Sequence, residues 1–245
     1  MEFVLSADLD WASEYCIENF LSIADRFAIQ PTIFVTHASA AIRKASREGR
    51  VELGIHPNFL QPSTHGESIG SIIEHVLELA PRATSVRCHR HVAGQEIERA
   101  LSSHGLRIDS NTHRHLQRGL APIELPSGLL RLPVFFEDDI HWAQNMTWRF
   151  RDHERDFFSP GLKILNFHPF LVSLNAPGAA FYQRHKRHIP TLTASDAARL
   201  RHQGDGIATF LIETIRVIQA SGCRFVSLSE MAEGLGHETL AAEMA

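Results

Sequence analysis

The chain has 245 residues, of which 44% are hydrophobic and 21% are charged, as is usual for a globular protein with a sizeable core. Its formal net charge of −4 disfavours a general nucleic-acid-binding protein, which would carry a basic face. The three cysteines are far apart and form no C-x-x-C pair, so a disulfide framework and a cysteine zinc site are disfavoured as well.

The first residues lack a basic segment followed by an apolar one, which is the pattern of a secretion signal. No stretch approaches the ~20 apolar residues that a membrane-spanning helix needs. We therefore expect a soluble, cytoplasmic protein without a membrane span. The composition indicates no particular oligomeric state.

Short apolar runs alternate with helical patterns along the first half of the chain. A buried strand is predicted at residues 2–8, followed by a helix up to about residue 28, in which apolar residues recur every three or four positions. The elements predicted next are, in order, a strand at 31–36, a helix at 38–48, a strand at 51–56, a helix near 69–77, a strand at 84–89, a helix at 95–105 and a strand at 106–111.

The second half is less regular. The predicted elements are a strand at 128–138, a strand at 162–168, an amphipathic helix over 207–218, a strand at 224–228 and a final short helix. Residues 140–160 and 172–195 have no clear pattern.

Strands that alternate with helices over the whole length predict parallel β/α units. The chain has no linker, repeat or low-complexity run that would divide it, so we predict that residues 1–245 form one domain. Seven or eight such units favour an α/β barrel, and the alternative is an open doubly wound sheet. Both folds place their active sites at the carboxyl ends of the strands.

Polar side chains follow six of the predicted strands at this end. In chain order they are Asp8 and Asp10, His56 with His65 in the following loop, Arg87 and His89, Asp109, then Glu137, Asp138 and Asp139, and finally His168. Asp and His together suit Zn²⁺ or another divalent cation. Each has a plainer explanation, such as a helix N-cap for Asp10 or a turn residue for His56. Their joint placement nevertheless favours a functional site.

The order of these residues resembles that of the NodB-like polysaccharide deacetylases, which are metal-dependent carbohydrate esterases built on a distorted (β/α) barrel. Their first motif ends a strand with two acidic residues, and "SADLD" is similar to it. The resemblance implies that Asp8 is the general base and Asp10 a metal ligand. The second motif supplies two histidine ligands, which "GIHPNFLQPSTHG" offers as His56 and His65.

The later motifs of the family are also similar, over roughly residues 2–235. "VRCH" implies that Arg87 orients the base, and "KILNFH" implies that His168 is the general acid. We assign the acidic partner of His168 to Asp138, with Asp109, Glu137 and Asp139 as the alternatives. The chain departs from the common pattern in two places. His56 and His65 are nine residues apart rather than four, and His89 and Arg90 stand where the family has Pro and an aromatic residue.

The resemblance implies a deacetylase that holds a divalent metal, with Zn²⁺ as our choice, and that acts on an acylated saccharide. Combined with the expected cytoplasmic location, it predicts a nucleotide-sugar or lipid-linked precursor of a surface polysaccharide as substrate. The acyl group is expected to be N-acetyl, with N-formyl or an O-ester as alternatives. We assign Trp11, His89 and Trp142 to substrate binding, and regard Phe135 and Phe136 as core residues.

Two other functions stay open. The first is a different metal-dependent barrel hydrolase, either an amidohydrolase or a phosphoesterase, because "HRH" occurs at 89–91 and 113–115. The second is a non-catalytic carbohydrate-binding relic of the deacetylase fold. The presence of Asp8, Asp10, His56, Arg87 and His168 in one chain disfavours the relic.

Overall fold

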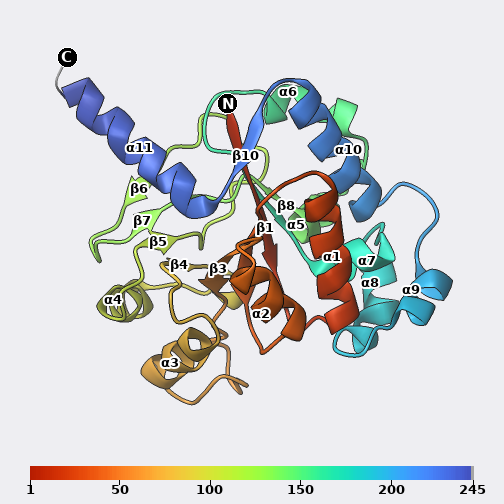
Figure 1. The fold of residues 1–245 in the computed structure, drawn as a ribbon, viewed down its shortest axis with the longest axis horizontal. Helices are drawn as coiled ribbons and strands as arrows, with labels where there is room; N and C mark the ends of the chain where they lie inside the picture. The colour runs from red at the N-terminus through yellow and green to blue at the C-terminus, as the bar shows by residue number, and fades with distance from the viewer. Residues whose placement is uncertain (244–245) are drawn as a thin grey trace.

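The computed structural model describes the backbone of residues 1–243 and the side chains of residues 1–235, and its centre is a curled, mostly parallel sheet (Figure 1). The strands are β1 (Glu2–Asp8), β2 (Thr32–Val35), β3 (Glu52–Ile55), β4 (Ser85–Val86), β5 (Ile108–Asp109), β6 (Ile123–Glu124), β7 (Leu130–Arg131), β8 (Phe136–Glu137), β9 (Ile164–Phe167) and β10 (Arg224–Val226).

The strands lie in the order β6-β7-β5-β4-β3-β2-β1-β9-β8, and β10 pairs with the start of β1. All pairings are parallel except that of β6 with β7. The segments after β5 and before β8 also meet, through a parallel bridge between His113 and Val134. The sheet therefore curls into a half-barrel, which confirms the predicted α/β fold with its distorted barrel.

Helices and short helical turns link or follow the strands (Figure 1). They are α1 (Glu14–Arg26), α2 (Ala40–Arg47), α3 (Ile69–Leu79), α4 (Gln95–Ser103), α5 (Asp138–Ala143), α6 (Glu154–Phe157), α7 (Pro169–Leu174), α8 (Ala179–His185), α9 (Ala194–Leu200), α10 (Ile207–Ala220) and α11 (Leu228–Glu243), with 3₁₀ turns η1 (His89–His91), η2 (Phe150–Asp152) and η3 (Lys186–His188). None of the helices within residues 1–243 is long and apolar enough to cross a membrane.

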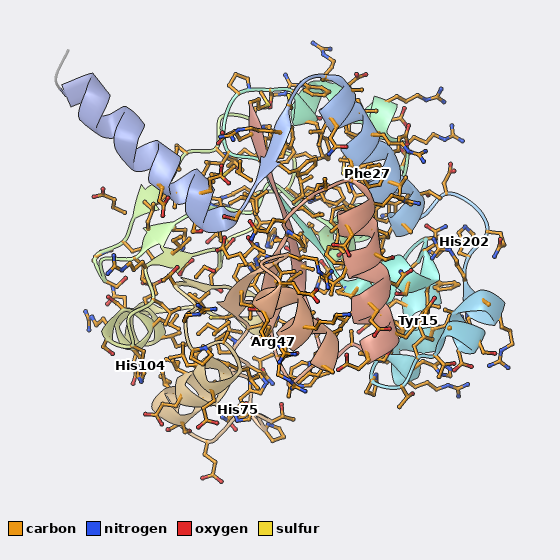
Figure 2. The ribbon with its side chains drawn as sticks, in the orientation of Figure 1. Tyr15, Phe27, Arg47, His75, His104 and His202 are labelled. Atoms are coloured by element: carbon orange, nitrogen blue, oxygen red, sulfur yellow. The ribbon has the colours of Figure 1, made fainter. Side chains whose placement is uncertain are left out.

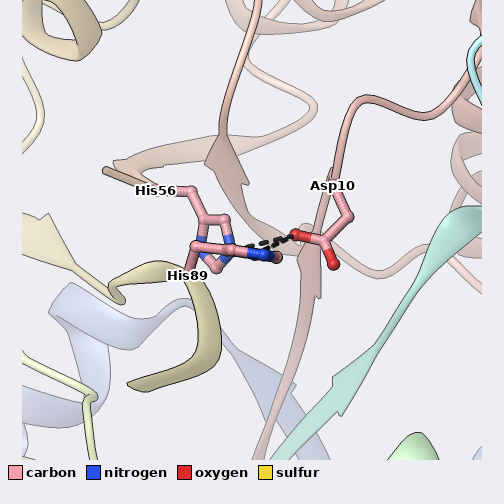
Figure 3. Close-up of side chains that lie close together, drawn as sticks. All are labelled: Asp10, His56 and His89. Carbon is pink, nitrogen blue, oxygen red and sulfur yellow. Dashed lines mark hydrogen bonds and ion pairs between the residues drawn. The ribbon is translucent and has the colours of Figure 1, made fainter. Parts of the chain in front are cut away.

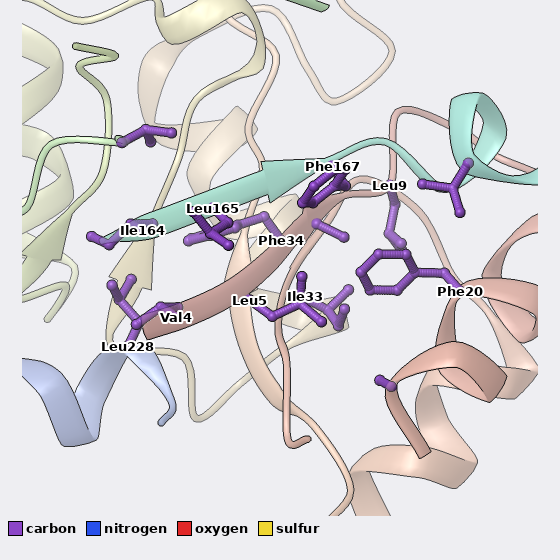
Figure 4. Packing of buried hydrophobic residues seen from close by; sticks show 14 of the residues in the cluster. Val4, Leu5, Leu9, Phe20, Ile33, Phe34, Ile164, Leu165, Phe167 and Leu228 are labelled. Atoms are coloured by element: carbon purple, nitrogen blue, oxygen red, sulfur yellow. The ribbon is translucent and has the colours of Figure 1, made fainter. Parts of the chain in front are cut away.

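Strand β1 lies in the middle of the sheet and is buried on both faces. Val4 and Leu5 pair with Ile164 and Leu165 of β9, and the other end of β1 pairs with β2 (Figure 4). A parallel strand that is covered on both sides reads as a nearly continuous apolar run. This burial produces the apolar run from which the strand at residues 2–8 is predicted. It also means that Asp8, at the end of β1, is buried.

The predicted strand at 128–138 is wrong as a single element. It consists of β7 and β8, which pair with different neighbours, β5 and β9. Pro133 lies between them and cannot donate a ladder hydrogen bond, which explains the break. The segments without a clear pattern contain short helices, including α6 and α8.

Several of the sixteen histidines lie away from the strand ends. Figure 2 shows His75 on α3, His104 at the end of α4 and His202 near α9, all at the periphery of the molecule. A different pair, His115 and His141, is packed inside. The backbone N–H of Glu137 donates to His115 Nδ1 over 3.4 Å, His115 Nε2 lies 3.0 Å from His141 Nδ1, and His141 Nε2 lies 2.8 Å from the carbonyl oxygen of Thr147.

This chain of contacts requires both imidazoles to be neutral, with the proton of each on Nε2. Burial lowers the pKa of His141 to about 4 and that of His115 to about 3. Below pH 6.5 the unfolded chain therefore binds protons that the folded chain does not. The free energy of unfolding should fall as the pH is lowered from about 6.5 to 4, by up to about 1.4 kcal/mol per pH unit for His141.

Denaturant titrations across this pH range test the expectation. The variant His141→Gln should show a shallower pH dependence than the wild type, by about the slope of one proton. The variant His75→Gln changes an exposed histidine and serves as the control. An unchanged slope in His141→Gln would contradict the assignment of a neutral buried His141.

Candidate active site

The carboxyl ends of β1, β3, β4, β8 and β9 meet on one side of the curled sheet, and the polar side chains that follow these strands gather there. The turn after β1 is unusual, because Asp10 and Trp11 both have positive φ values, 44° and 55°. The backbone N–H of Trp11 donates to Thr36 Oγ1 over 3.1 Å, which fixes this turn to the end of β2. Left-handed conformations in non-glycine residues cost about 1–3 kcal/mol and often mark functional sites.

Asp10, His56 and His89 form the first cluster at this end (Figure 3). Asp10 Oδ1 lies 3.1 Å from His56 Nε2 and 2.9 Å from His89 Nδ1. Burial opposes the ionisation of Asp10, but the hydrogen bonds from both histidines hold its pKa well below the ordinary value. The Asp10 side chain is still 29% exposed, so the cluster can be reached from solvent.

This donor set fits a divalent metal. The candidate ligand atoms of the three residues lie within 4.8 Å of one another, and one carboxylate oxygen is shared by two imidazoles. Two imidazoles and one carboxylate are a common protein ligand set for catalytic Zn²⁺, and they leave a position free for water or substrate. Asp10, His56 and His89 are therefore the residues that would hold the cation.

His65, which the second motif predicts as a metal ligand, lies outside this cluster. The backbone N–H of Asn58 donates to His65 Nδ1 over 3.1 Å, and His65 Nε2 lies 2.8 Å from the carbonyl oxygen of Thr36. Both ring nitrogens thus serve to pin the loop after β3, and neither presents a free lone pair. Burial lowers the pKa of His65 to about 4, in keeping with a neutral ring. His89, which was assigned to substrate binding, lies against Asp10 instead.

Asp8 is held by two residues from other strands. Arg87 Nη1 donates to Asp8 Oδ1 over 3.0 Å, and Asn166 Nδ2 donates to Asp8 Oδ2 over 2.9 Å. Arg87 is fully buried and its guanidinium also donates to Ser6 and Ser110. The position of Asp8 is thus fixed through both of its oxygens. Asn166 has no counterpart among the predicted site residues.

Removal of Arg87 should destabilise the protein strongly, because it leaves the Asp8 carboxylate buried without its counter-charge. Breaking a buried pair in this way costs about 3–5 kcal/mol. We expect Arg87→Met to lower the free energy of unfolding by that amount in a urea titration. Arg151→Met, at a side chain that is 72% exposed, should change it by less than about 0.5 kcal/mol. Equal midpoints for the two variants would show that Arg87 does not compensate Asp8.

His168 and Asp138 form the third element of the site. Asp138 Oδ1 lies 2.6 Å from His168 Nδ1, and Asp138 Oδ2 accepts from the backbone N–H of His168 over 2.8 Å. Burial alone would lower the pKa of His168, but the Asp138 carboxylate, helped by Asp139 and Asp10, holds it well above the ordinary value. His168 Nε2 lies 3.7 Å from Asp10 Oδ2, so its second nitrogen is turned toward the metal cluster.

The other candidates for the acidic partner are not hydrogen-bonded to His168, although Glu137 and Asp139 each bring an oxygen within 4.8 Å of one of its ring nitrogens. Asp109 accepts from Arg131 Nε and Nη2 over 2.9 and 3.0 Å and has no contact with His168. Glu137 Oε2 lies 2.8 Å from His91 Nε2. Burial would raise the pKa of Glu137, but His91 lowers it to about 2. The pairing of His91 with Glu137 was not predicted.

A cavity of about 90 Å³ opens beside Asp10 and His168. It is lined by Leu9, Asp10, Asp139, Trp142, His168, Phe170, Leu171, Tyr182 and Ile189. Burial, reinforced by neighbouring carboxylates and opposed by His168, raises the pKa of Asp139 to about 7. A larger hollow of about 440 Å³ is lined by the amino ends of β3 and β4, at the opposite end from the polar clusters.

Of the two tryptophans predicted to bind substrate, only Trp142 is among the residues that line this cavity. Trp142 forms part of its wall and its ring centroid is 5.6 Å from that of Tyr182. The ring of Trp11 lies edge-on to that of His89, with centroids 5.2 Å apart. Phe135 and Phe136 are fully buried core residues.

Residues 5–186 match a family model described as WbmS-like polysaccharide deacetylase. The match covers most of the chain and includes all three elements of the site. The chain belongs to this family. None of the curated proteins searched matches this member of the WbmS-like family.

Solved structures resemble this WbmS-like chain over nearly its whole length. One is a Bordetella bronchiseptica protein described as a candidate polysaccharide deacetylase involved in O-antigen biosynthesis, with 28% identity, a TM-score of 0.78, and coverage of 88% of this chain and 89% of that one. Two others share only the fold. A family 4 acetyl xylan esterase from Clostridium thermocellum, solved with a cobalt ion, has 13% identity, a TM-score of 0.53 and coverages of 96% and 92%. The peptidoglycan deacetylase PdaC from Bacillus subtilis has 13% identity, a TM-score of 0.53 and coverages of 100% and 95%.

Proposed function

We propose that this chain is a metal-dependent deacylase that hydrolyses the N-acyl group of a sugar in a surface-polysaccharide precursor. The observation that carries the proposal is the convergence of three groups of residues: Asp8 with Arg87, Asp10 with His56 and His89, and His168 with Asp138. Asp8 and His168 have polar atoms within 4.8 Å of each other, which suits a base and an acid that act on one substrate bond. A non-catalytic relic would have no need for all three groups.

Amide hydrolysis requires a base for the attacking water and an acid for the departing amine. Asp8 takes the proton of the water, and Arg87 and Asn166 hold its carboxylate in place. His168 donates its Nε2 proton to the amine nitrogen as the C–N bond breaks, while Asp138 keeps the ring oriented through Nδ1. A divalent cation bound by Asp10, His56 and His89 would act as a Lewis acid on the acyl carbonyl and the water.

The cavity beside His168 is proposed to hold the acyl group. The cavity of about 90 Å³ is several times the roughly 10–15 Å³ that one water needs, so it can take a group of a few heavy atoms. Acetyl is our first choice, and formyl fits as well. Trp142, which lines the cavity, would offer an aromatic face to the sugar, and we assign the same role to Trp11 beside His89.

The substrate class rests on the similarity to the Bordetella protein, which is described as involved in O-antigen biosynthesis. The metal is supported by the donor set, and by the cobalt ion in the esterase of the same fold. We propose Zn²⁺ as the cation, and a nucleotide-linked or lipid-linked N-acyl sugar as the substrate. The proposed location of the reaction is the cytoplasm.

Acyl release from defined substrates tests the proposal. The Zn²⁺-loaded protein should release acetate or formate, with an equal amount of free amine, from at least one nucleotide-linked or lipid-linked N-acyl sugar. Treatment with a chelator should abolish the release. Release of phosphate without acyl release would indicate a phosphoesterase. The proposal would be contradicted if the cation-loaded protein released neither an acyl group nor phosphate from nucleotide-linked and lipid-linked N-acyl sugars.

A further inference from the structure

A second group of candidate ligands lies beside the proposed active site. Among the residues whose side chains the structure describes, His91, His113 and Glu137 also bring one ligand atom each within 4.8 Å of one another. The proposed reaction assigns no role to any of these three residues. Two imidazoles with a carboxylate are a ligand set for Zn²⁺ and other first-row divalent cations.

The three residues come from separate segments that the backbone fixes independently. His91 ends the η1 turn, and its backbone N–H donates to the carbonyl oxygen of Cys88 over 2.8 Å. His113 forms the bridge with Val134 that joins the two edges of the curl. Glu137 is the last residue of β8. Their meeting point is therefore set by the fold rather than by one flexible loop.

The strained backbone between His89 and His91 directs these two histidines to different clusters of candidate ligands. Arg90 and His91 have φ values of 55° and 53°, and neither is a glycine. In this conformation His89 contacts Asp10 while His91, two residues later, contacts Glu137. Two successive left-handed residues cost about 1–3 kcal/mol each, and such strain persists where surrounding structure requires it.

His91 also has an unsatisfied atom. Its Nε2 lies 2.8 Å from Glu137 Oε2, but its Nδ1 is buried and has no hydrogen-bond partner among the described residues. A buried polar atom without a partner costs about 1–3 kcal/mol. The ring centroid of His113 lies 5.3 Å from that of His91, so both imidazoles and the Glu137 carboxylate are close enough to share one cation.

We propose that His91, His113 and Glu137 form a second site for a divalent transition-metal cation, with Zn²⁺ as the expected occupant. The site adjoins the proposed catalytic centre, because Asn166 Nδ2 donates to Asp8 Oδ2 over 2.9 Å and to Glu137 Oε1 over 3.4 Å. A cation there places a second positive charge close to Asp8. The proposal does not depend on the deacylase activity.

Equilibrium dialysis of the full chain against Zn²⁺, with the bound metal counted by mass spectrometry, tests the second site. We expect two equivalents in the wild type and one in His113→Ala. The side chain of His113 is exposed, so its removal should leave the fold intact. His185→Ala, in α8 and outside both groups, should keep both equivalents.

Asp10→Asn separates this proposal from that of the first cation. This variant should also lower the number of bound Zn²⁺ equivalents by one, because it removes a proposed ligand of the first cluster only. A count that His113→Ala does not reduce relative to His185→Ala would overturn the second site, whatever the wild-type value. A count reduced by His113→Ala but not by Asp10→Asn would keep the second site and contradict the first.

Discussion

Asp8→Asn is expected to lower the rate of acyl release by about 10²–10⁴-fold while cation binding stays at the wild-type level. The amide at position 8 cannot take a proton from water, whereas the proposed ligands Asp10, His56 and His89 remain. The structure supports this separation of roles, because Asp8 contacts Arg87 and Asn166 and lies outside the group that includes Asp10.

The same variant has a predictable cost in stability. One atom of the new amide can accept from Arg87, but its NH₂ group would face the NH₂ group of Asn166, which donates to Asp8 in the wild type. The loss of one such bond costs about 1–3 kcal/mol. Thermal unfolding and metal content should therefore be measured on the sample used for the assay. A folded, metal-loaded Asp8→Asn protein with the wild-type rate would exclude Asp8 as the base.

His89→Ala and His65→Ala are expected to differ sharply in metal affinity. Loss of a residue that only supports a ligand costs about 10–100-fold in affinity, so loss of the direct ligand His89 should exceed about 100-fold. His65→Ala should leave the affinity unchanged, because both of its ring nitrogens are engaged by backbone groups. The family motif alone makes the opposite prediction for His65.

The two variants form a matched pair, since each removes an imidazole from the same side of the sheet. Competition with a chromophoric chelator measures the affinity of both, and urea titration checks their folding. His65→Ala should be less stable than the wild type, because it leaves the backbone N–H of Asn58 and the carbonyl oxygen of Thr36 without their partner. A strong loss of affinity in His65→Ala together with normal affinity in His89→Ala would restore the motif-based ligand set.

Most of the fold could be predicted because its strands are short apolar runs that alternate with helical patterns. Residues directly at strand ends, such as Asp8, His56 and Arg87, could be placed for the same reason: parallel strands carry their carboxyl ends to one side. The single strand predicted at 128–138 failed because a proline interrupts an apolar run that the pattern alone reads as continuous.

His89, the third candidate ligand, could not be predicted from the spacing of residues in the sequence. Its position depends on the left-handed turns at Asp10, Trp11, Arg90 and His91, and no glycine marks these turns in the sequence. His65 looked like the ligand because a family motif supplies a histidine after His56. One sequence feature does point to His89. It stands, two residues after Arg87, where the family has proline.

Anomalous scattering of Zn²⁺ in crystals of the wild-type chain measures directly whether Asp10, His56 and His89 hold the cation. We expect a peak about 2.0–2.2 Å from the ligand atoms of these three residues, with none at His65. Well-ordered density for all four side chains without a peak among the first three, or with a peak at His65 instead, would contradict this expectation.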